Sequence, residues 1–227
     1  MSSSSETGAF VQTPSQTVGP FFGYALPYQG GADVVDRTHP AAIRLHGRVF
    51  DGAGVGVPDA IVEVWQPDES GVISTELGSF ERDGYTFTGF GRVPTTRAGD
   101  YTFTTVKPGV AVAGGVAGVA VAGGDATGAG HPEAGAASAA VAVAGAPYAL
   151  ITVFARGLLH HLFTRAYFVD ADGAESFESF AQTDATLSTV LADRRATLVA
   201  SQDGPGSYRF DITLQGDNET VFFDFDA

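Results

Sequence analysis

The 227-residue sequence contains no cysteine. This absence excludes disulfides, zinc thiolate sites, iron–sulfur clusters and thiol nucleophiles, and it leaves the redox compartment undetermined. Basic residues are also scarce, because 12 Lys and Arg stand against 26 Asp and Glu, for a formal net charge of −14. A field of this sign repels phosphate groups, so nucleic acid and anionic membrane surfaces are poor partners.

Targeting and membrane signals are also missing. The start of the chain, Met1–Gly8, has neither a basic segment nor an apolar one. It therefore does not resemble a secretory signal, which favours a cytoplasmic location. The most apolar stretch, residues 109–124, is rich in glycine, and it is shorter than the roughly 20 apolar residues that a spanning helix needs. We therefore expect no association with a membrane.

The composition that remains, 44% hydrophobic and 17% charged, is typical of a globular chain that can bury a sizeable core. We expect a flexible N-terminus over residues 1–12 and a docking arm over 13–41, where turn formers precede the aromatic pair Phe21–Phe22. Residues 42–227 then form the folded domain. Within it, residues 109–146 are almost entirely Gly, Ala and Val, which predicts a low-complexity insertion.

Alternation of apolar and polar side chains predicts the secondary structure of this domain. In residues 42–50, Ile43, Leu45 and Val49 share one face, a period of two that is typical of a strand. The pattern recurs at 60–66, 85–91, 101–106, 149–155, 161–168, 208–214 and 219–225. Many short strands favour an all-β fold, an antiparallel β-sandwich, with the first two strands paired. One short accessory helix is expected over about 184–200.

Motifs that carry chemistry are weak when judged from the residues alone. His160 and His161 are consecutive on a predicted strand, so their side chains leave opposite faces and cannot readily share a metal ion. His131-Pro132-Glu133 has a spacing that some non-haem iron sites use, but the insertion offers no rigid surroundings. Residues 52–56 form a glycine-rich turn that leads into a strand instead of a helix. No Gly-x-Ser-x-Gly elbow is present.

Several segments, taken in order, nevertheless resemble the intradiol ring-cleavage dioxygenases. They are Thr13–Phe21, Gly47–Gln66, Phe90–Gly109, Phe154–Phe168 and the stretch from Tyr208 to the end. The resemblance covers about residues 13–226, apart from the insertion. It implies a β-sandwich subunit of an oxidoreductase in aromatic catabolism. It also implies a homologous beta chain as partner, in which two tyrosines and two histidines hold a ferric ion, Fe(3+).

The same resemblance implies that this chain has lost those four iron ligands. The histidine positions are occupied by Tyr148 and Leu150, and the tyrosine positions by Ile73 and Ala111. Hydrocarbon side chains offer no lone pair to a metal, and one tyrosine is a single donor where four are needed. The resemblance therefore implies no iron in this chain and no catalytic residue of its own.

The resemblance implies that this chain completes the substrate pocket of its partner. In the family, the arm and one arginine of this subunit approach the substrate, which carries over to Thr17, Gly19, Pro20 and Arg156. Glycine lets backbone approach a flat ring closely, and a guanidinium pairs with a carboxylate as a fork. The implied reaction is cleavage of protocatechuate by O2, between the hydroxylated carbons, to 3-carboxy-cis,cis-muconate.

The residues leave two other functions open. A non-catalytic β-sandwich binding module would use Phe21–Phe22 and the insertion to grip another protein, and it would not depend on an iron-bearing partner. A self-sufficient iron dioxygenase would require ligand positions different from those given above.

Overall fold

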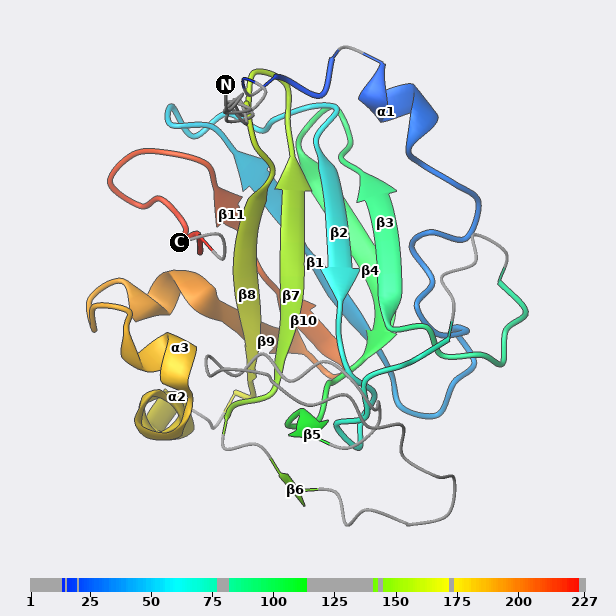
Figure 1. The fold of residues 1–227 in the computed structure, drawn as a ribbon, viewed down its shortest axis with the longest axis vertical. Helices are drawn as coiled ribbons and strands as arrows, with labels where there is room; N and C mark the ends of the chain where they lie inside the picture. The colour runs from blue at the N-terminus through cyan, green and yellow to red at the C-terminus, as the bar shows by residue number, and fades with distance from the viewer. Residues whose placement is uncertain are drawn as a thin grey trace, which may run out of the picture.

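The computed structural model describes residues 14, 16–19, 21–76, 82–113, 141–142, 145–171 and 174–224. Two layers of strands face each other (Figure 1). The front layer holds β2 (Ile61–Trp65), β3 (Phe90–Pro94), β7 (Tyr148–Phe154) and β8 (Leu162–Val169). The rear layer holds β1 (Ala42–Phe50), β4 (Asp100–Val106), β10 (Ser207–Arg209) and β11 (Ile212–Thr213), and β9 (Val199–Gly204) connects the two. The predicted all-β sandwich is confirmed.

The sheet is mixed, which the sequence analysis did not anticipate. Its order is β11-β1-β10-β9-β8-β7-β2-β3, with β4 on the other side of β1. Strand β1 runs parallel to both β10 and β11, and β8 runs parallel to β9. Parallel neighbours need a long crossover connection, and residues 170–198 supply one between β8 and β9.

The expected pairing of the strands 42–50 and 60–66 is wrong. Strand β1 pairs with β4, β10 and β11, whereas β2 lies between β3 and β7. The two strands instead face each other across the main core, where Leu45, Val49, Val62 and Val64 are fully buried. The Asp51 carboxylate accepts the Val55 amide at 2.9 Å. This local turn lets the chain pass from one layer to the other.

The helical region differs from the single helix expected over 184–200. It consists of α2 (Ala174–Thr183), α3 (Ala185–Ser188) and a 3-10 turn η1 (Arg195–Leu198). Asp184 interrupts the helix because its carboxylate accepts the Leu187 amide at 2.8 Å and starts a new one. A second, smaller core forms here, in which Phe177, Leu187 and Leu198 pack with Tyr167 of β8.

Other expected segments are shorter than predicted or only partly described. Of residues 85–91, only Phe90 and Gly91 belong to β3, because Asp83 accepts two amides in the preceding turn. In the tail, Phe223 makes an isolated bridge to Phe163. In the insertion, β5 (Val112–Ala113) pairs with β6 (Val141–Ala142); residues 114–140, like the predicted N-terminus 1–12, lie outside the described residues. In the described part, no helix is long and apolar enough to cross a membrane.

An ion pair ties the end of β4 to the end of β8 and yields a pH prediction. The Lys107 ammonium donates to both Asp170 oxygens at 2.7 Å, and the Tyr208 hydroxyl donates to one of them at 2.6 Å. The Lys107 hydrogen bond, followed by that of Tyr208, lowers the pKa of Asp170 below its usual value. The stability that this shift contributes is present above the unfolded pKa of Asp, and it is lost as the pH falls through the lower, folded pKa.

We therefore expect Asp170→Asn to destabilise the protein at neutral pH and to reduce the acid sensitivity of its unfolding. The free energy of unfolding can be measured by urea titration at successively lower pH values, starting from pH 7. The gap between wild type and variant should shrink as the pH falls below the unfolded pKa of Asp and through the lower, folded pKa of Asp170. A gap of constant size over that range would show that the Asp170 charge contributes nothing.

Candidate functional site

The two histidine positions that the resemblance implied lie side by side on the outer face of β7. Tyr148 and Leu150 are two residues apart, so their side chains leave the same face of the strand. Both are half-buried. In register, Leu150 stands between Trp65 of β2 and Arg165 of β8. The surroundings of these positions are therefore set by Trp65 and Arg165.

The positively charged side chain of Arg165 occupies this face of β7. The Arg165 guanidinium lies 4.1 Å from the centre of the Tyr148 ring, and its side chain is only 13% exposed. It donates to the Tyr167 hydroxyl at 3.3 Å and lies 3.6 Å from the Asp184 carboxylate, whose side chain is 6% exposed. A trivalent metal ion beside a guanidinium would meet strong repulsion in a partly buried site. The outer face of β7 therefore accommodates the Arg165 guanidinium, stacked on the Tyr148 ring, instead of a metal ion.

The two tyrosine positions are equally unsuited to a metal. Ile73 is 52% exposed. Ala111 follows Val110, whose backbone lies close to Gly71, because a Cβ at Gly71 would be 2.9 Å from the Val110 carbonyl carbon. The segment before Ala111 is therefore packed against the loop before Ile73. Neither side chain has a donor atom. Among the described residues, no group of three or more His, Cys, Asp or Glu is placed to hold a metal ion. Ferric iron does not fit the residues found at these positions.

Asp184 anchors this region, and we expect Asp184→Ala to cost about 2 to 4 kcal/mol of unfolding free energy. The variant would leave Arg165 without its buried counter-charge and would remove the cap of α3. Glu178→Ala is the matched control, because it breaks the pair with Arg195 at 3.1 Å but its carboxylate is 61% exposed; we expect a change below about 1 kcal/mol. Equal losses in urea unfolding of the two variants would contradict this account.

The residues predicted to approach substrate gather at the opposite end of the front layer. Arg156 follows β7 in the loop to β8, and this loop lies at the same end of the sandwich as the helix α1 (Phe22–Ala25) (Figure 1). Thr17 and Gly19 precede α1; Thr17 is exposed, whereas Gly19 is half-buried and has a φ of 76°. Pro20 lies outside the described residues.

Arg156 is held by a carboxylate from another loop. Its side chain is 69% exposed, and its Nη2 donates to Asp59 Oδ2 at 2.8 Å. Asp59 stands just before β2. A Cβ at Gly23 of α1 would lie 3.8 Å from the Asp59 Cβ, so α1 passes close to the same residue. The sequence analysis did not single out Asp59, and a pair that spans 97 residues leaves no local signal in a sequence.

His46, His160 and His161 do not form a site in the part of the chain that the structure describes. His160 and His161 are exposed, and the His161 ring lies edge to face with Phe163 at 4.5 Å. His46 contacts the Asp203 carboxylate at 2.9 Å. His131 and Glu133 lie outside the described residues. The structure therefore leaves the prediction for His131 and Glu133 untested.

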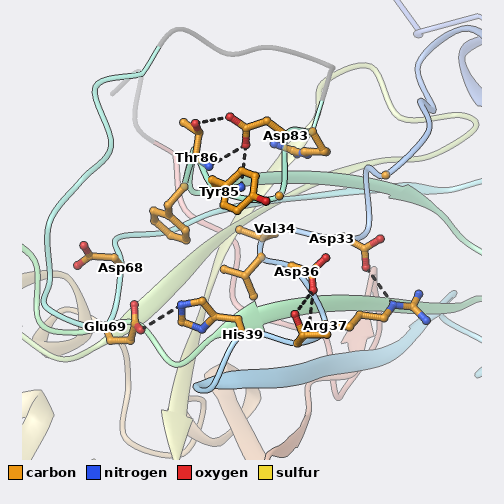
Figure 2. Close-up of a pocket in the computed structure, with 16 residues that line it drawn as sticks. Asp33, Val34, Asp36, Arg37, His39, Asp68, Glu69, Asp83, Tyr85 and Thr86 are labelled. Carbon is orange, nitrogen blue, oxygen red and sulfur yellow. Dashed lines mark hydrogen bonds and ion pairs between the residues drawn. The ribbon is translucent and has the colours of Figure 1, made fainter.

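A cavity of about 510 Å³ lies elsewhere, and acidic side chains outnumber basic ones in its lining. Figure 2 shows carboxylates around it, with His39 near Glu69 at 3.9 Å and Asp83 in a turn with Tyr85 and Thr86. The hydrogen bonds from Thr86 lower the pKa of Asp83 to about 2, so this group stays charged. The carboxylates outnumber the two arginines of the lining, Arg37 and Arg82, because Asp33, Asp36, Asp68 and Glu69 also line the cavity. Its net negative charge disfavours an anionic substrate.

Comparison with known proteins decides the family. A family model described as dioxygenase matches residues 19–216. The chain is 38% identical to the protocatechuate 3,4-dioxygenase alpha chain of Burkholderia cepacia, over 94% of this chain and 97% of that protein. It is 37% identical to the alpha chain of the same name from Pseudomonas putida, over 94% and 96%. The chain belongs to the intradiol dioxygenase family.

Solved structures agree with this dioxygenase fold. The chain is similar to the intradiol ring-cleavage dioxygenase from Tetranychus urticae, with a TM-score of 0.50 and 14% identity, over 83% of this chain and 89% of that one. At this identity the likeness shows the fold alone. Four of the five sequence segments that resemble the family, those after residue 46, contain strands and loops of this one sandwich.

Proposed function

We propose that this chain is the alpha subunit of a protocatechuate 3,4-dioxygenase and completes the substrate pocket of an iron-bearing beta subunit. The observation that carries the proposal is the 37–38% identity to alpha chains over 94% of the sequence. The occupied face of β7 supports it, because Arg165 stacks on Tyr148 where a metal ligand pair would be needed. The chain thus depends on a homologous partner for the metal.

Tyrosine and histidine side chains of the beta subunit would hold the ferric iron, and the iron would chelate the substrate diol and activate it for reaction with O2. The product of cleavage between the hydroxylated carbons is 3-carboxy-cis,cis-muconate. This chain makes and breaks no bond of the substrate. Its contribution is to bind and orient the ring and to exclude water, which lowers the barrier by fixing geometry in advance.

Arg156 is the residue that we assign to the ring carboxylate of protocatechuate. Its guanidinium is exposed at the end of the sandwich where α1 lies, so it is accessible to a pocket shared with a partner (Figure 1). Thr17, Gly19 and Pro20 lie in the segment just before α1. We assign them to the rim of the pocket, where the backbone of Gly19, without a Cβ, comes close to the aromatic ring.

A non-catalytic binding module is the weaker alternative. It would explain the exposed aromatic side chains Phe21 and Tyr24, which are 74% and 87% exposed on either side of the buried Phe22. An interface with a beta subunit explains them equally well. The match to dioxygenase alpha chains extends over nearly the whole of both proteins, so the dioxygenase is favoured.

The proposal is tested by expressing the chain alone and together with a homologous beta chain that carries the four iron ligands. We expect the two chains to purify as one complex, and protocatechuate cleavage, followed by the loss of its ultraviolet absorbance, to appear in the complex alone. A lone chain that is stable and ignores the beta chain would favour the binding module. Ring cleavage by the lone chain would show that the ligand positions are wrong.

A further inference from the structure

The backbone at Asp59 is unusual. Its φ is 60°, the only positive value found for a residue other than glycine in the described part of the chain. This region costs free energy for a residue with a Cβ, although Asp tolerates it better than most. Such strain persists where the surrounding structure fixes it, and it is concentrated at functional sites.

Hydrogen bonds on both sides of Asp59 hold this conformation. The Thr95 hydroxyl, in a residue that is 7% exposed, donates to the Val57 carbonyl at 2.8 Å and accepts the Ala60 amide at 2.9 Å. Pro58, between them, has its own φ fixed by its ring. The Asp59 carboxylate therefore leaves a rigid turn at a fixed place, 57% exposed, beside α1 and the β7–β8 loop.

The contact with Arg156 leaves room for a second carboxylate. A single hydrogen bond joins the two groups, from Nη2 to Oδ2. Nη2 carries two protons: one is paired with the N–H of Nε along one edge of the guanidinium, and the other is paired with an N–H of Nη1 along another edge. Whichever proton Asp59 accepts, one edge with two parallel N–H groups stays available, the geometry that binds a carboxylate through both oxygens.

We propose that Asp59 is a positioning residue that holds Arg156 in the orientation required to bind the ring carboxylate of protocatechuate. The inference rests on the proposed function. An exposed ion pair such as Arg156–Asp59 contributes little to the stability of the fold. Its effect is instead to fix the long Arg156 side chain before substrate binds, so that less rotamer entropy is lost on binding. Asp59 also lies against α1, which places it between the arm and the arginine.

The test uses the assembled alpha–beta enzyme with Asp59→Asn, which keeps the shape of the side chain and its tolerance of a positive φ but removes the charge. We expect KM for protocatechuate to rise about 3- to 10-fold, with kcat unchanged. KM for catechol, which has no ring carboxylate, should stay the same, as should the thermal midpoint. Glu178→Gln is the matched control: it removes one exposed carboxylate from an ion pair on α2, and we expect no change in either KM.

A second comparison separates this inference from the proposed function. In an Arg156→Ala background, Asp59→Asn should have no further effect on KM, because its effect passes through the arginine. If Arg156→Ala discriminates between the two substrates but Asp59→Asn leaves KM unchanged, the positioning role is refuted and the proposed function stands. If KM falls in Asp59→Asn, the carboxylate competes with substrate, which also overturns the inference. If Arg156→Ala does not discriminate, the inference fails together with the assignment of Arg156 to the ring carboxylate, whereas the role as an alpha subunit is refuted only by the co-expression experiment.

Discussion

Replacing Arg156 by alanine in the assembled enzyme should lower kcat/KM for protocatechuate about 10- to 100-fold and leave kcat/KM for catechol nearly unchanged. The reason is that a hydrogen-bonded contact to a charged group contributes about 1.5 to 3 kcal/mol, and catechol lacks the carboxylate that would receive it. Arg156→Lys should fall between the two, because lysine keeps the charge but loses the planar fork. Steady-state kinetics with both substrates, on the same preparations, measure the effect.

A control is needed because removal of any cation makes this acidic protein less attractive to an anion. Arg37→Ala removes the same charge from an exposed side chain, 78% accessible and also paired with an aspartate. We expect this variant to change kcat/KM less than about 2-fold, an effect of the overall field alone. Equal losses for Arg156→Ala and Arg37→Ala, or equal losses for both substrates, would remove Arg156 from the pocket.

Gly47→Ala should have the largest effect on stability. Gly47 lies in β1, opposite Tyr101 of β4, and a Cβ at this position would fall 2.6 Å from the carbonyl carbon of Phe210 and closer still to its oxygen. That carbonyl cannot move aside easily. It accepts the hydroxyl of the buried Tyr101, and the Phe210 amide donates to the His46 carbonyl at 2.7 Å. We expect a loss of more than about 4 kcal/mol, or no folded protein.

Gly204→Ala is the matched control for this prediction. It also adds one methyl group to a strand, β9, but there the Cβ would meet only the Ser207 Cβ at 3.8 Å, an ordinary contact. Its free energy of unfolding should lie within about 1 kcal/mol of wild type. Comparable losses in urea unfolding for the two variants would show that the close approach at Gly47 is not what limits the substitution.

Sequence patterns predicted the strands well where one face of the strand is buried. The strand expected at 42–50 is β1, with the same bounds, because its alternation comes from Leu45, Val49 and their polar neighbours. The expected partner was wrong, since alternation shows which face is buried but not which strand lies alongside. The region 85–91 failed for a local reason, because the carboxylate of Asp83 holds a turn that competes with the strand.

The site was less accessible to sequence reasoning. The resemblance pointed to Arg156 and to four positions at which it implied that iron ligands are lost, but it could not show which side chains surround those positions. Arg165 stacked on Tyr148, with Asp184 behind it, is an arrangement of three elements that no spacing in the sequence reveals. The partner of Arg156 is likewise invisible, because Asp59 is distant in the chain and its positive φ is a property of the folded turn.

The central claim is that this chain shapes the pocket of a metal enzyme without holding the metal. The most direct measurement is the iron content, by mass spectrometry of the metal, of the lone chain and of the purified alpha–beta complex. We predict no bound iron in the lone chain and one ferric ion for each alpha–beta pair. Stoichiometric iron in the lone chain, or two ions per pair, would contradict the account and would mean that Tyr148 and Leu150 do not mark the ligand positions.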